Sequence, residues 1–595
     1  MAVMVLCNQI ERILNPRSVA VIGASGDSTK WGDSVLALIR DDAMLKGHIA
    51  LISQSEALTG AMLAHAYDIG AGFSFCVSLG DQADLETCDF LEYAIADANT
   101  KVMALYIEGL KNPARFKALL EAARRAGKPV LITKAGRTSS GARAVHSHTA
   151  SMAGAYQSFR AMVEGQAATI IDDPLQLVAE AAVWDAHRPM RGARVAVFSS
   201  SGDGGVLAVD ALEDAGLMAA TLSDTGALAL GRLASLATAR LPLDIGAVQS
   251  SLQKTVHSDS WLQDVLATVM DDAQVDAGLY LMTTQPDMEG VANAFVQAQH
   301  ASAKPLVFIN AASSCGIEAV ARIKASGLAH FASLPQAAQH LRHRYRYASH
   351  CADLANPGSL PRLDAQALEK TVAKLPAGIV SEPQTKALLH AAGVPVALGR
   401  VATSAPDAVA AAESLGYPVV MKVVSPQITH KSDIGGVLVG VRTAQAVQEG
   451  FERIRGAAAR VPGARFDGCL VQRMATSEAE LLVGTHWDAQ LGAFLTFGFG
   501  GTLVELHRDT CLLPADAGPA QVRRALPSLR LHPTLTGYRG RQPADLEGLV
   551  DVICRMGRLA VYFGERLQEC EVNPLMINGA TIVAADARAV WKPCR

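Results

Sequence analysis

The chain has 595 residues, of which half are hydrophobic and 5% are aromatic, and its formal net charge is −4. This length predicts about three to four domains. The scarcity of aromatic residues favours an α/β protein with buried parallel strands over an all-β protein. The charge gives no sign of a nucleic-acid or membrane partner. The ten cysteines include no C-x-x-C pair, so neither a zinc site nor a redox motif is indicated.

The first residues, MAVMVLCNQIERIL, lack the basic region and the cleavage-like site of a signal peptide. No apolar run approaches the roughly 18 to 20 residues that span a bilayer. We therefore expect a soluble cytoplasmic protein, and the sequence leaves open whether it forms a homo-oligomer.

Residues 17–26, RSVAVIGASG, predict a short buried strand followed by a glycine turn, and residues 31–40 have helical spacing. This pattern begins a Rossmann-like unit, in which backbone N–H groups at the start of the helix face a phosphate. After residue 46 an apolar strand opens a different pattern. Strands alternate with helices over residues 47–190, and again over 191–348. Each block starts with a strand, a small polar loop and a helix, which predicts two copies of a doubly wound, flavodoxin-like parallel sheet.

Residues 349–378 include Pro357, Pro361 and Pro376 and predict a linker. The remainder, 379–595, predicts helices at 382–392, 406–415 and 546–563. It also predicts strands at 418–424, 437–441, 468–474, 480–484, 493–497, 571–577 and 581–585.

The stretch YPVVMKVVSPQITHKSDIGGV, residues 417–437, carries the strongest signal. Its β-branched strand delivers Lys422 into the interior, where an ammonium group is costly unless it meets an anion. The following loop contains His430, Lys431, Asp433 and two glycines, and it can fold over phosphates. The alternative is an edge strand with a solvated lysine followed by an ordinary turn.

Two further motifs lie towards the C-terminus. Three close glycines in FGFGG, residues 497–501, allow backbone to approach a phosphate, although such a run is as often a tight turn. Asn573 and Asp586 lie on two consecutive predicted strands and can face the same point, where hard oxygen ligands suit Mg²⁺. The alternative is a hairpin with two capped polar ends.

The stretch at 417–437 resembles, nearly residue by residue, the ATP-grasp segment of the ADP-forming acyl-CoA synthetases, which are relatives of succinyl-CoA ligase. PRSVAVIGAS is similar to the opening of the CoA-binding domain of this family. The resemblance implies an α/β chain with five parts. These are a truncated CoA-binding Rossmann-like segment at 1–46, two flavodoxin-like ligase domains at 47–190 and 191–348, a linker at 349–378 and an ATP-grasp domain at 379–595. Most of the CoA-binding domain is therefore expected to be missing.

The resemblance also implies which residues bind ATP, Mg²⁺ and coenzyme A. Gln472 is placed at the adenine hinge and Glu480 at the ribose, although without the resemblance each reads as a solvent-facing residue. The full implied set is Lys422, His430, Lys431, Asp433, Gln472, Glu480, Gly498, Gly500 and Gly501 for ATP, Asn573 and Asp586 for magnesium, and Gly23, Ala24 and Ser25 for CoA.

The sequence SHTASMAG, residues 147–154, resembles the phosphohistidine loop of the family, and His148 is its candidate nucleophile. Glu108 resembles the carboxylate that orients this histidine, although it can also be a surface acid at a strand end. Two helix starts are expected to hold the phosphate, one formed by Ser53, Gln54 and Ser55 and the other by Ser200, Ser201 and Gly202. Ala150 and Glu56 depart from the family pattern, which has glycine at both positions.

The reaction implied by the resemblance converts a carboxylic acid, CoA and ATP into acyl-CoA, ADP and phosphate through a phosphohistidine and an acyl phosphate. The expected acid is an aromatic hydroxycinnamate such as ferulate, with acetate or another short acid as the other possibility. A non-catalytic relative that senses acyl-CoA or nucleotide remains an alternative, because residues 47–190 carry the two departures and little of the CoA-binding domain is present.

Overall fold

The computed structural model describes residues 46–593, except 81, 83, 139, 142, 144–155, 185–187, 234–239, 246–258, 285–287, 429 and 502–508. The chain divides into two units. One comprises Met1–Tyr156 and Gln166–Ala352, and the other comprises Gln157–Gly165 and Asp353–Arg595. The predicted Rossmann-like segment, with Gly23, Ala24 and Ser25, lies outside the described residues. No helix in the described part of the chain is both long and apolar enough to cross a membrane.

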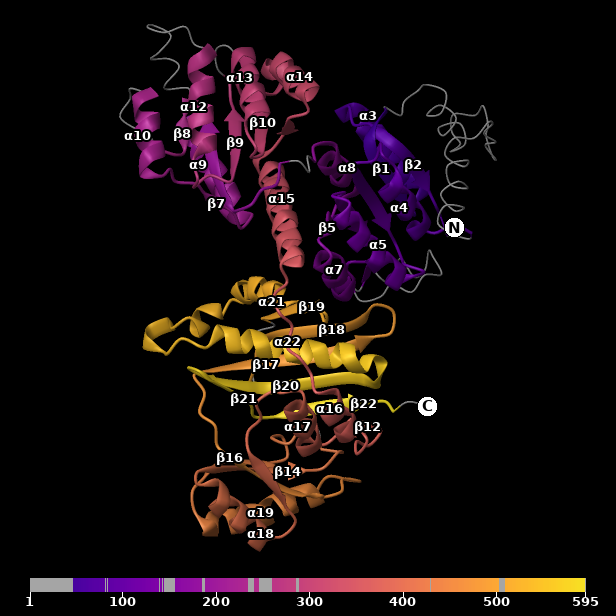
Figure 1. The fold of residues 1–595 in the computed structure, drawn as a ribbon, viewed down its shortest axis with the longest axis vertical. Helices are drawn as coiled ribbons and strands as arrows, with labels where there is room; N and C mark the ends of the chain where they lie inside the picture. The colour runs from indigo at the N-terminus through magenta and orange to yellow at the C-terminus, as the bar shows by residue number, and fades with distance from the viewer. Residues whose placement is uncertain are drawn as a thin grey trace. The chain divides into compact units, whose positions relative to one another are not determined.

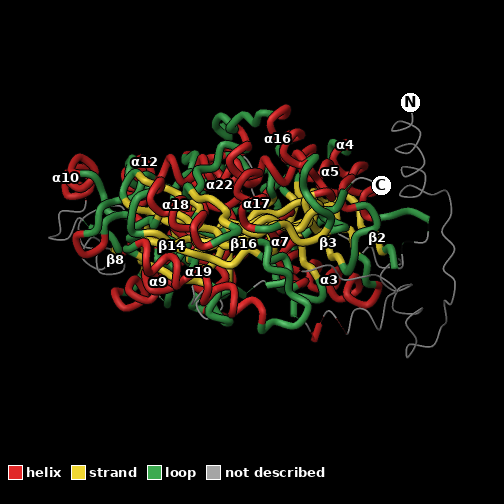
Figure 2. The backbone as a smooth tube through the Cα atoms, turned by 90° about the horizontal axis from the view of Figure 1, so that it is seen from below, coloured by secondary structure: helices red, strands yellow, loops and turns green. Residues whose placement is uncertain are grey.

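The first sheet of unit 1 is parallel and has the order β2-β1-β3-β4-β5. Figure 2 shows α3 below its strands and α4 and α5 above them. Apolar side chains of α3 and α8 form one core with Leu51, Ala104 and Leu131 of the sheet. The strands are β1 (Lys46–Ser53), β2 (Phe73–Ser78), β3 (Val102–Ile107), β4 (Val130–Lys134) and β5 (Thr169–Ile170), and the helices are α3 (Glu56–Ile69), α4 (Thr87–Ala96), α5 (Pro113–Arg125) and α8 (Pro174–Ala182). Helix α7 (Tyr156–Gly165) belongs to unit 2 from Gln157 onward.

The second sheet of unit 1 has the order β11-β10-β9-β6-β7, with β8 paired to β6. Its strands are β6 (Arg194–Ser199), β7 (Met218–Ala219), β8 (Leu243–Asp244), β9 (Ala277–Met282), β10 (Leu306–Asn310) and β11 (Ala329–Phe331). Without the short β8, both sheets run 2-1-3-4-5 along the chain, which is the flavodoxin-like order. The prediction of two flavodoxin-like sheets is confirmed.

Successive residues of β6, β9 and β10 face opposite sides of the second sheet, because side chains alternate along a strand. One side packs against α10 (Asp224–Leu233), α12 (Asp259–Asp271), α13 (Met288–Ala301) and α14 (Ile317–Ser326). The other side packs against α9 (Gly202–Asp214) and α15 (Leu334–Ala355). Helix α9 begins at Gly202, directly after the polar loop.

Unit 2 contains two antiparallel sheets, drawn in orange to yellow in Figure 1. The larger has the order β12-β22-β20-β17-β18-β19, with β21 paired to β20, and the smaller has the order β13-β16-β14-β15. The strands are β12 (Gly378–Val380), β13 (Gly399–Ala402), β14 (Val419–Val424), β15 (Val437–Val441), β16 (Gly468–Arg473), β17 (Ala479–Asp488), β18 (Gly492–Phe499), β19 (Thr510–Pro514), β20 (Leu567–Asn578), β21 (Thr581–Ala584) and β22 (Ala587–Trp591). The helices are α16 (Ala365–Val372), α17 (Glu382–Ala391), α18 (Ala405–Leu415), α19 (Ala444–Ala459), α21 (Pro519–Ala525) and α22 (Leu546–Phe563).

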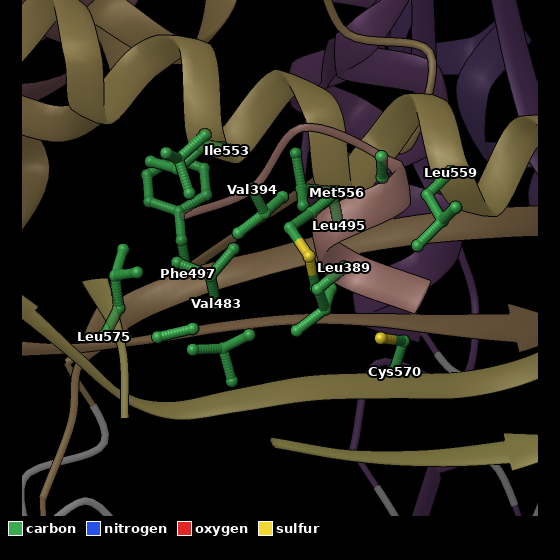
Figure 3. Packing of buried hydrophobic residues seen from close by; sticks show 14 of the residues in the cluster. Leu389, Val394, Val483, Leu495, Phe497, Ile553, Met556, Leu559, Cys570 and Leu575 are labelled. Atoms are coloured by element: carbon green, nitrogen blue, oxygen red, sulfur yellow. The ribbon is translucent and has the colours of Figure 1, made fainter. Parts of the chain in front are cut away.

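Helix α22 supports the larger sheet and has the predicted bounds. Asp545 caps its first turn by accepting a hydrogen bond from the N–H of Gly548 at 3.0 Å. Its apolar residues recur at helical spacing, so that Ile553, Met556 and Leu559 form one face. Figure 3 shows these side chains above the strands. They meet Val483, Leu495, Phe497, Cys570 and Leu575 from β17, β18 and β20.

The smaller sheet has an apolar side covered by α18 and α19. Val419, Met421 and Val423 of β14 belong to this core. The alternate residues, including Lys422, therefore face the other side. Because β14 lies between β16 and β15, it is an inner strand, and the alternative of an edge strand with a solvated lysine is wrong.

One sequence-based assignment needs correction. Strand β21 ends at Ala584, so Asp586 is not on a strand but in the short turn that leads to β22. It is nevertheless next to Asn573, whose N–H donates to the Asp586 carbonyl at 3.2 Å.

Candidate functional site

Lys422 lies in a buried cluster of charged side chains in unit 2. Its Nζ donates to Glu382 Oε1 at 2.9 Å and to Asp586 Oδ2 at 3.1 Å. Lys431, from the loop after β14, donates to the same two carboxylates, reaching Asp586 Oδ1 at 2.9 Å and also contacting Glu382 Oε2. The structure therefore brings together three predicted residues that are up to 164 positions apart.

A third lysine, Lys386, completes the cluster. It donates to Glu382 Oε1 and to the Ala585 carbonyl, both at 2.8 Å, and to the side-chain oxygen of Gln472. Gln472 is only 2% exposed, which excludes the solvent-facing reading of this residue. It lies on the same face of the smaller sheet as Lys422, because Val471 of β16 points into the helix-covered core.

The electrostatics of the cluster follow from burial and mutual charge. Burial alone raises the pKa of Glu382, but Lys422, Lys386 and Lys431 outweigh it and hold this pKa far below its usual range. Burial lowers the pKa of Lys386 to about 8. Burial also disfavours charge on Lys431, yet Glu382 and Asp586 together raise its pKa. Three ammonium groups and two carboxylates leave an excess of one positive charge, which suits an anionic ligand.

The predicted glycine run is linked to the same cluster. The N–H of Gly501 donates to Asn573 Oδ1 at 3.0 Å, and Asn573 in turn bonds the backbone of Asp586. Gly501 has φ +84, a conformation that favours glycine. The N–H of Gly500 donates to the carbonyl of Glu480 at 2.8 Å. A continuous chain of contacts therefore joins Glu480, the glycine run, Asn573 and the lysines.

The other residues predicted to bind ATP lie differently. A Cβ added to Gly498 would be 2.1 Å from the carbonyl oxygen of Asp509, so the approach of β19 accounts for this glycine. His430 and Asp433 are exposed on the loop that carries Lys431 and are not brought into the cluster. Their assignment to ATP stays a prediction.

The donor atoms at Asn573 and Asp586 fit a magnesium ion. Both supply hard oxygens, and Mg²⁺ takes few protein ligands when phosphates and water fill its shell. Within the described ranges, no group of three or more His, Cys, Asp or Glu side chains is placed to hold a metal. Glu571 is a further acid at this end, and burial raises its pKa.

The first polar loop of unit 1 lies where the strand order reverses between β1 and β3. Gln54 is buried there and donates to Thr87 Oγ1 and the Gly109 carbonyl, both at 2.9 Å. Its Oε1 accepts from the N–H groups of Glu108 at 2.7 Å and Gly109 at 3.0 Å. These bonds occupy the whole amide. Gln54 therefore anchors the loop after β3, and its amide has no donor left for a phosphate.

The second polar loop repeats the first. Ser53 Oγ accepts from the N–H of Ser55 at 3.1 Å, and Ser199 Oγ accepts from the N–H of Ser201 at the same distance. Ser200 Oγ accepts a hydrogen bond from the N–H of Thr283, just after β9, at 2.7 Å. Gln54 Oε1 makes the equivalent contact with the N–H groups just after β3. Ser55 and Ser201 are the N-caps of α3 and α9, and Gly202 is the first residue of α9.

Glu108 is half-buried beside a lysine that sequence reasoning missed. Lys134, at the end of β4, donates to the carbonyl oxygens of Glu108 at 2.8 Å and Ala135 at 2.7 Å. Burial lowers the pKa of Lys134 to about 8, against the opposing charge of Glu108. His148 and Ala150 lie outside the described residues. Glu56 is exposed in the first turn of α3.

Glu382 and Lys386 were also missed. The signal that could have found them is the spacing in SEPQTK, which places a glutamate and a lysine one turn apart on a predicted helix. That spacing is common on solvated helices, so only their burial distinguishes this pair.

Two family models match the chain. Residues 46–184 match the succinyl-CoA ligase-like flavodoxin domain, and residues 371–590 match an ATP-grasp domain.

Similar proteins cover most of the chain. Acetate–CoA ligase (ADP-forming) I of Archaeoglobus fulgidus is 31% identical over 554 residues, which are 92% of this chain and 78% of that protein. Trans-feruloyl-CoA synthase FCS1 of an unknown prokaryotic organism is 29% identical over 91% of this chain and 76% of its own. 4-Hydroxybutyrate–CoA ligase (ADP-forming) of Nitrosopumilus maritimus is 26% identical over 89% and 76%, respectively.

Both domain matches occur in one polypeptide, and a relative above 30% identity spans nearly all of it. The chain belongs to the ADP-forming acyl-CoA synthetases, the succinyl-CoA ligase-like family of CoA ligases that carry an ATP-grasp domain.

Proposed function

We propose that the chain joins a carboxylic acid to CoA while converting ATP to ADP and phosphate in the cytoplasm. The observation that carries the proposal is the buried cluster in which Lys422, Lys431, Gln472 and Asp586 meet. Such a concentration of ammonium groups is costly in a protein interior unless an anion uses it.

ATP occupies this cluster in the proposal. Lys422 and Lys431 hold its phosphates, Gln472 and Glu480 face adenine and ribose, and the glycine run at 498–501 approaches the phosphates. His430 and Asp433 contribute from the loop that carries Lys431. Mg²⁺ held by Asn573 and Asp586 supplies neutralising charge on the phosphate oxygens.

The phosphoryl group then passes through unit 1. A ring nitrogen of His148 attacks the terminal phosphorus and ADP leaves. Glu108 orients the imidazole. The loops at 53–55 and 200–202 hold the phosphate through backbone N–H groups. The substrate carboxylate takes the phosphoryl group from the histidine, and the CoA thiolate attacks the acyl carbon so that phosphate leaves. Gly23, Ala24 and Ser25 contribute to CoA binding.

The acid we propose is a hydroxycinnamate such as ferulate, with acetate or another short acid as the competing choice. One relative is named for feruloyl-CoA and others for acetate and 4-hydroxybutyrate. The proposed domain limits are 47–190 and 191–348 for the ligase domains and 379–595 for the ATP-grasp domain.

The test is a product assay with ATP, CoA and, in separate reactions, ferulate, acetate, succinate and phenylacetate. Thioester formation with equimolar ADP supports the proposal, whereas AMP and pyrophosphate contradict it. His148→Asn should abolish thioester formation, and retained turnover would exclude the histidine relay.

A non-catalytic sensor of acyl-CoA or nucleotide is the second candidate. It is favoured by the exposed carboxylate of Glu56 at a helix start that should hold phosphate, since like charges repel. Incubation with γ-labelled ATP separates the two, because a sensor acquires no acid-labile label.

A further inference from the structure

Glu382 is a carboxylate placed inside a site for anions. The exposure of the side chains rises from 3% at Glu382 to 7% at Lys386 and Lys422, 15% at Lys431 and 28% at Asp586. The cluster is therefore sealed at Glu382 and open at Lys431 and Asp586. A phosphate that entered at the open end would meet the lysines with Glu382 behind them.

Charge alone makes Glu382 unfavourable for such a ligand. A carboxylate close to a phosphate repels it, and the repulsion is stronger in a buried site than in water. Yet Glu382 accepts hydrogen bonds from all three lysines, through Oε1 from Lys386 and Lys422 and through Oε2 from Lys431. These lysines repel one another, and the carboxylate holds them at fixed positions.

Lys386 differs from the other two lysines in one partner: it donates to Gln472, whereas Lys422 and Lys431 donate to Asp586 at the open end. An ammonium group has three N–H donors, and those of Lys386 are directed at Glu382, Gln472 and the Ala585 carbonyl. It therefore ties together α17, the strand that carries Gln472 and the turn that carries Asp586.

We propose that Glu382 and Lys386 are positioning residues of the nucleotide site, a role that rests on the function proposed above. Glu382 fixes Lys422 and Lys431 as a preformed receptor for phosphate oxygens. Lys386 fixes Glu382 itself, together with Gln472 and the 585–586 turn. Preorganisation of this kind strengthens binding, because the ordering of long side chains is completed before the ligand arrives.

The decisive variant is Glu382→Gln, which keeps the shape of the side chain and removes its charge. If the residue acted only through its charge, the variant would bind an anion more tightly. If it positions the lysines, binding becomes weaker. We expect the Kd for Mg·ADP, measured by calorimetry on the full chain, to rise at least tenfold. The KM values for the acid and CoA should stay within twofold of wild type.

Glu413→Gln is the matched control, because Glu413 is an exposed carboxylate on α18 in the same unit. It should leave the Kd unchanged. Lys386→Met should weaken Mg·ADP binding to a similar extent. The double variant should be no weaker than the worse single variant, because the two residues act through one another.

Equal or tighter binding by Glu382→Gln would overturn the inference, as would fully additive effects in the double variant. If Glu382→Gln does not fold, Mg·ADP binding by Glu382→Asp tests the inference instead, since this variant keeps the charge but shortens the side chain. Weaker binding then supports positioning, and unchanged binding refutes it. A folded wild-type chain that binds neither Mg·ADP nor Mg·ATP refutes the proposed nucleotide site itself.

Discussion

Replacing His340 with phenylalanine should loosen the contact between α8 and α15. Glu180 on α8 is fully buried and accepts a hydrogen bond from His340 Nδ1 of α15 at 2.7 Å. His343 Nδ1 lies 3.5 Å from the other carboxylate oxygen, and Arg344 is a further charge beside His340. His340→Phe keeps a ring of similar size next to Trp184 and Phe331. It thus removes the principal partner of Glu180 without leaving a large cavity.

The expected loss of folding stability is about 1.5–3 kcal/mol. Burial opposes ionisation of Glu180, but His340 and His343 outweigh it and lower its pKa from 4.5 to about 2. Burial lowers the pKa of His340, so at pH 7 its neutral imidazole donates a hydrogen bond to the Glu180 carboxylate, and such a bond contributes about 1.5–3 kcal/mol. Because the pKa is lower in the folded protein, this stability is present above about pH 4.5 and is lost as the pH falls towards 2.

Hydrogen exchange followed by mass spectrometry measures this effect in the full chain. At pH 7, amides of α8 and of the first half of α15 should exchange roughly 10- to 150-fold faster in the variant, since every 1.36 kcal/mol changes the opening equilibrium tenfold. His300→Phe, at an exposed position of α13 in the same unit, should leave these amides unchanged. If the amides of α8 exchange at the wild-type rate in His340→Phe, the imidazole does not stabilise the buried Glu180 carboxylate.

Four further substitutions test unit 2. Lys422→Met should reduce kcat/KM for ATP, measured by ADP release, by at least about 100-fold, because charge-assisted hydrogen bonds contribute about 1.5–3 kcal/mol each. A change below twofold would show that Lys422 does not bind the nucleotide. In α19, Gly456→Ala should raise the urea midpoint, since nothing lies within 4 Å of the added Cβ and alanine favours helix by about 0.5–1 kcal/mol. Gly450→Ala should not raise the urea midpoint, because its Cβ would lie 2.9 Å from Leu438 Cδ1. An equal rise of the midpoint in both variants would contradict this packing. Phe497→Ala, at a fully buried position, should cost about 3–5 kcal/mol, and a loss below 1 kcal/mol would show that the core tolerates the cavity.

The sequence was informative wherever local periodicity decides structure. Helix 546–563 and strand 437–441 have the predicted bounds, and in the helix apolar spacing and the capping residue Asp545 account for them. The flavodoxin-like repeat was equally legible, since the strand, polar loop and helix occur in each copy. The structure adds that the equivalence extends to single hydrogen bonds, such as those accepted by Ser53 and Ser199.

Partners distant in sequence were not predictable in the same way. Nothing near Glu382 indicates that Lys431 and Asp586 are its neighbours, because their meeting depends on how the two sheets of unit 2 are connected. Asp586 lies in the turn before β22 rather than on a strand, and this position lets it reach both Lys422 and Lys431. The amide of Gln54 gives a second case: its residue type suggested a phosphate ligand, whereas its contacts commit it to the loop after β3.

The two predicted phosphate sites illustrate different solutions to one electrostatic problem. In unit 1 the polar loops offer backbone N–H groups at helix starts, which carry only partial charge and are inexpensive to bury. In unit 2 full charges are buried, and each must be matched by a partner or by a ligand. An excess of one ammonium group leaves this match incomplete in the free protein. That imbalance favours an anionic ligand at the open end of the cluster, which is the reason why Glu382 must hold the lysines rather than neutralise them.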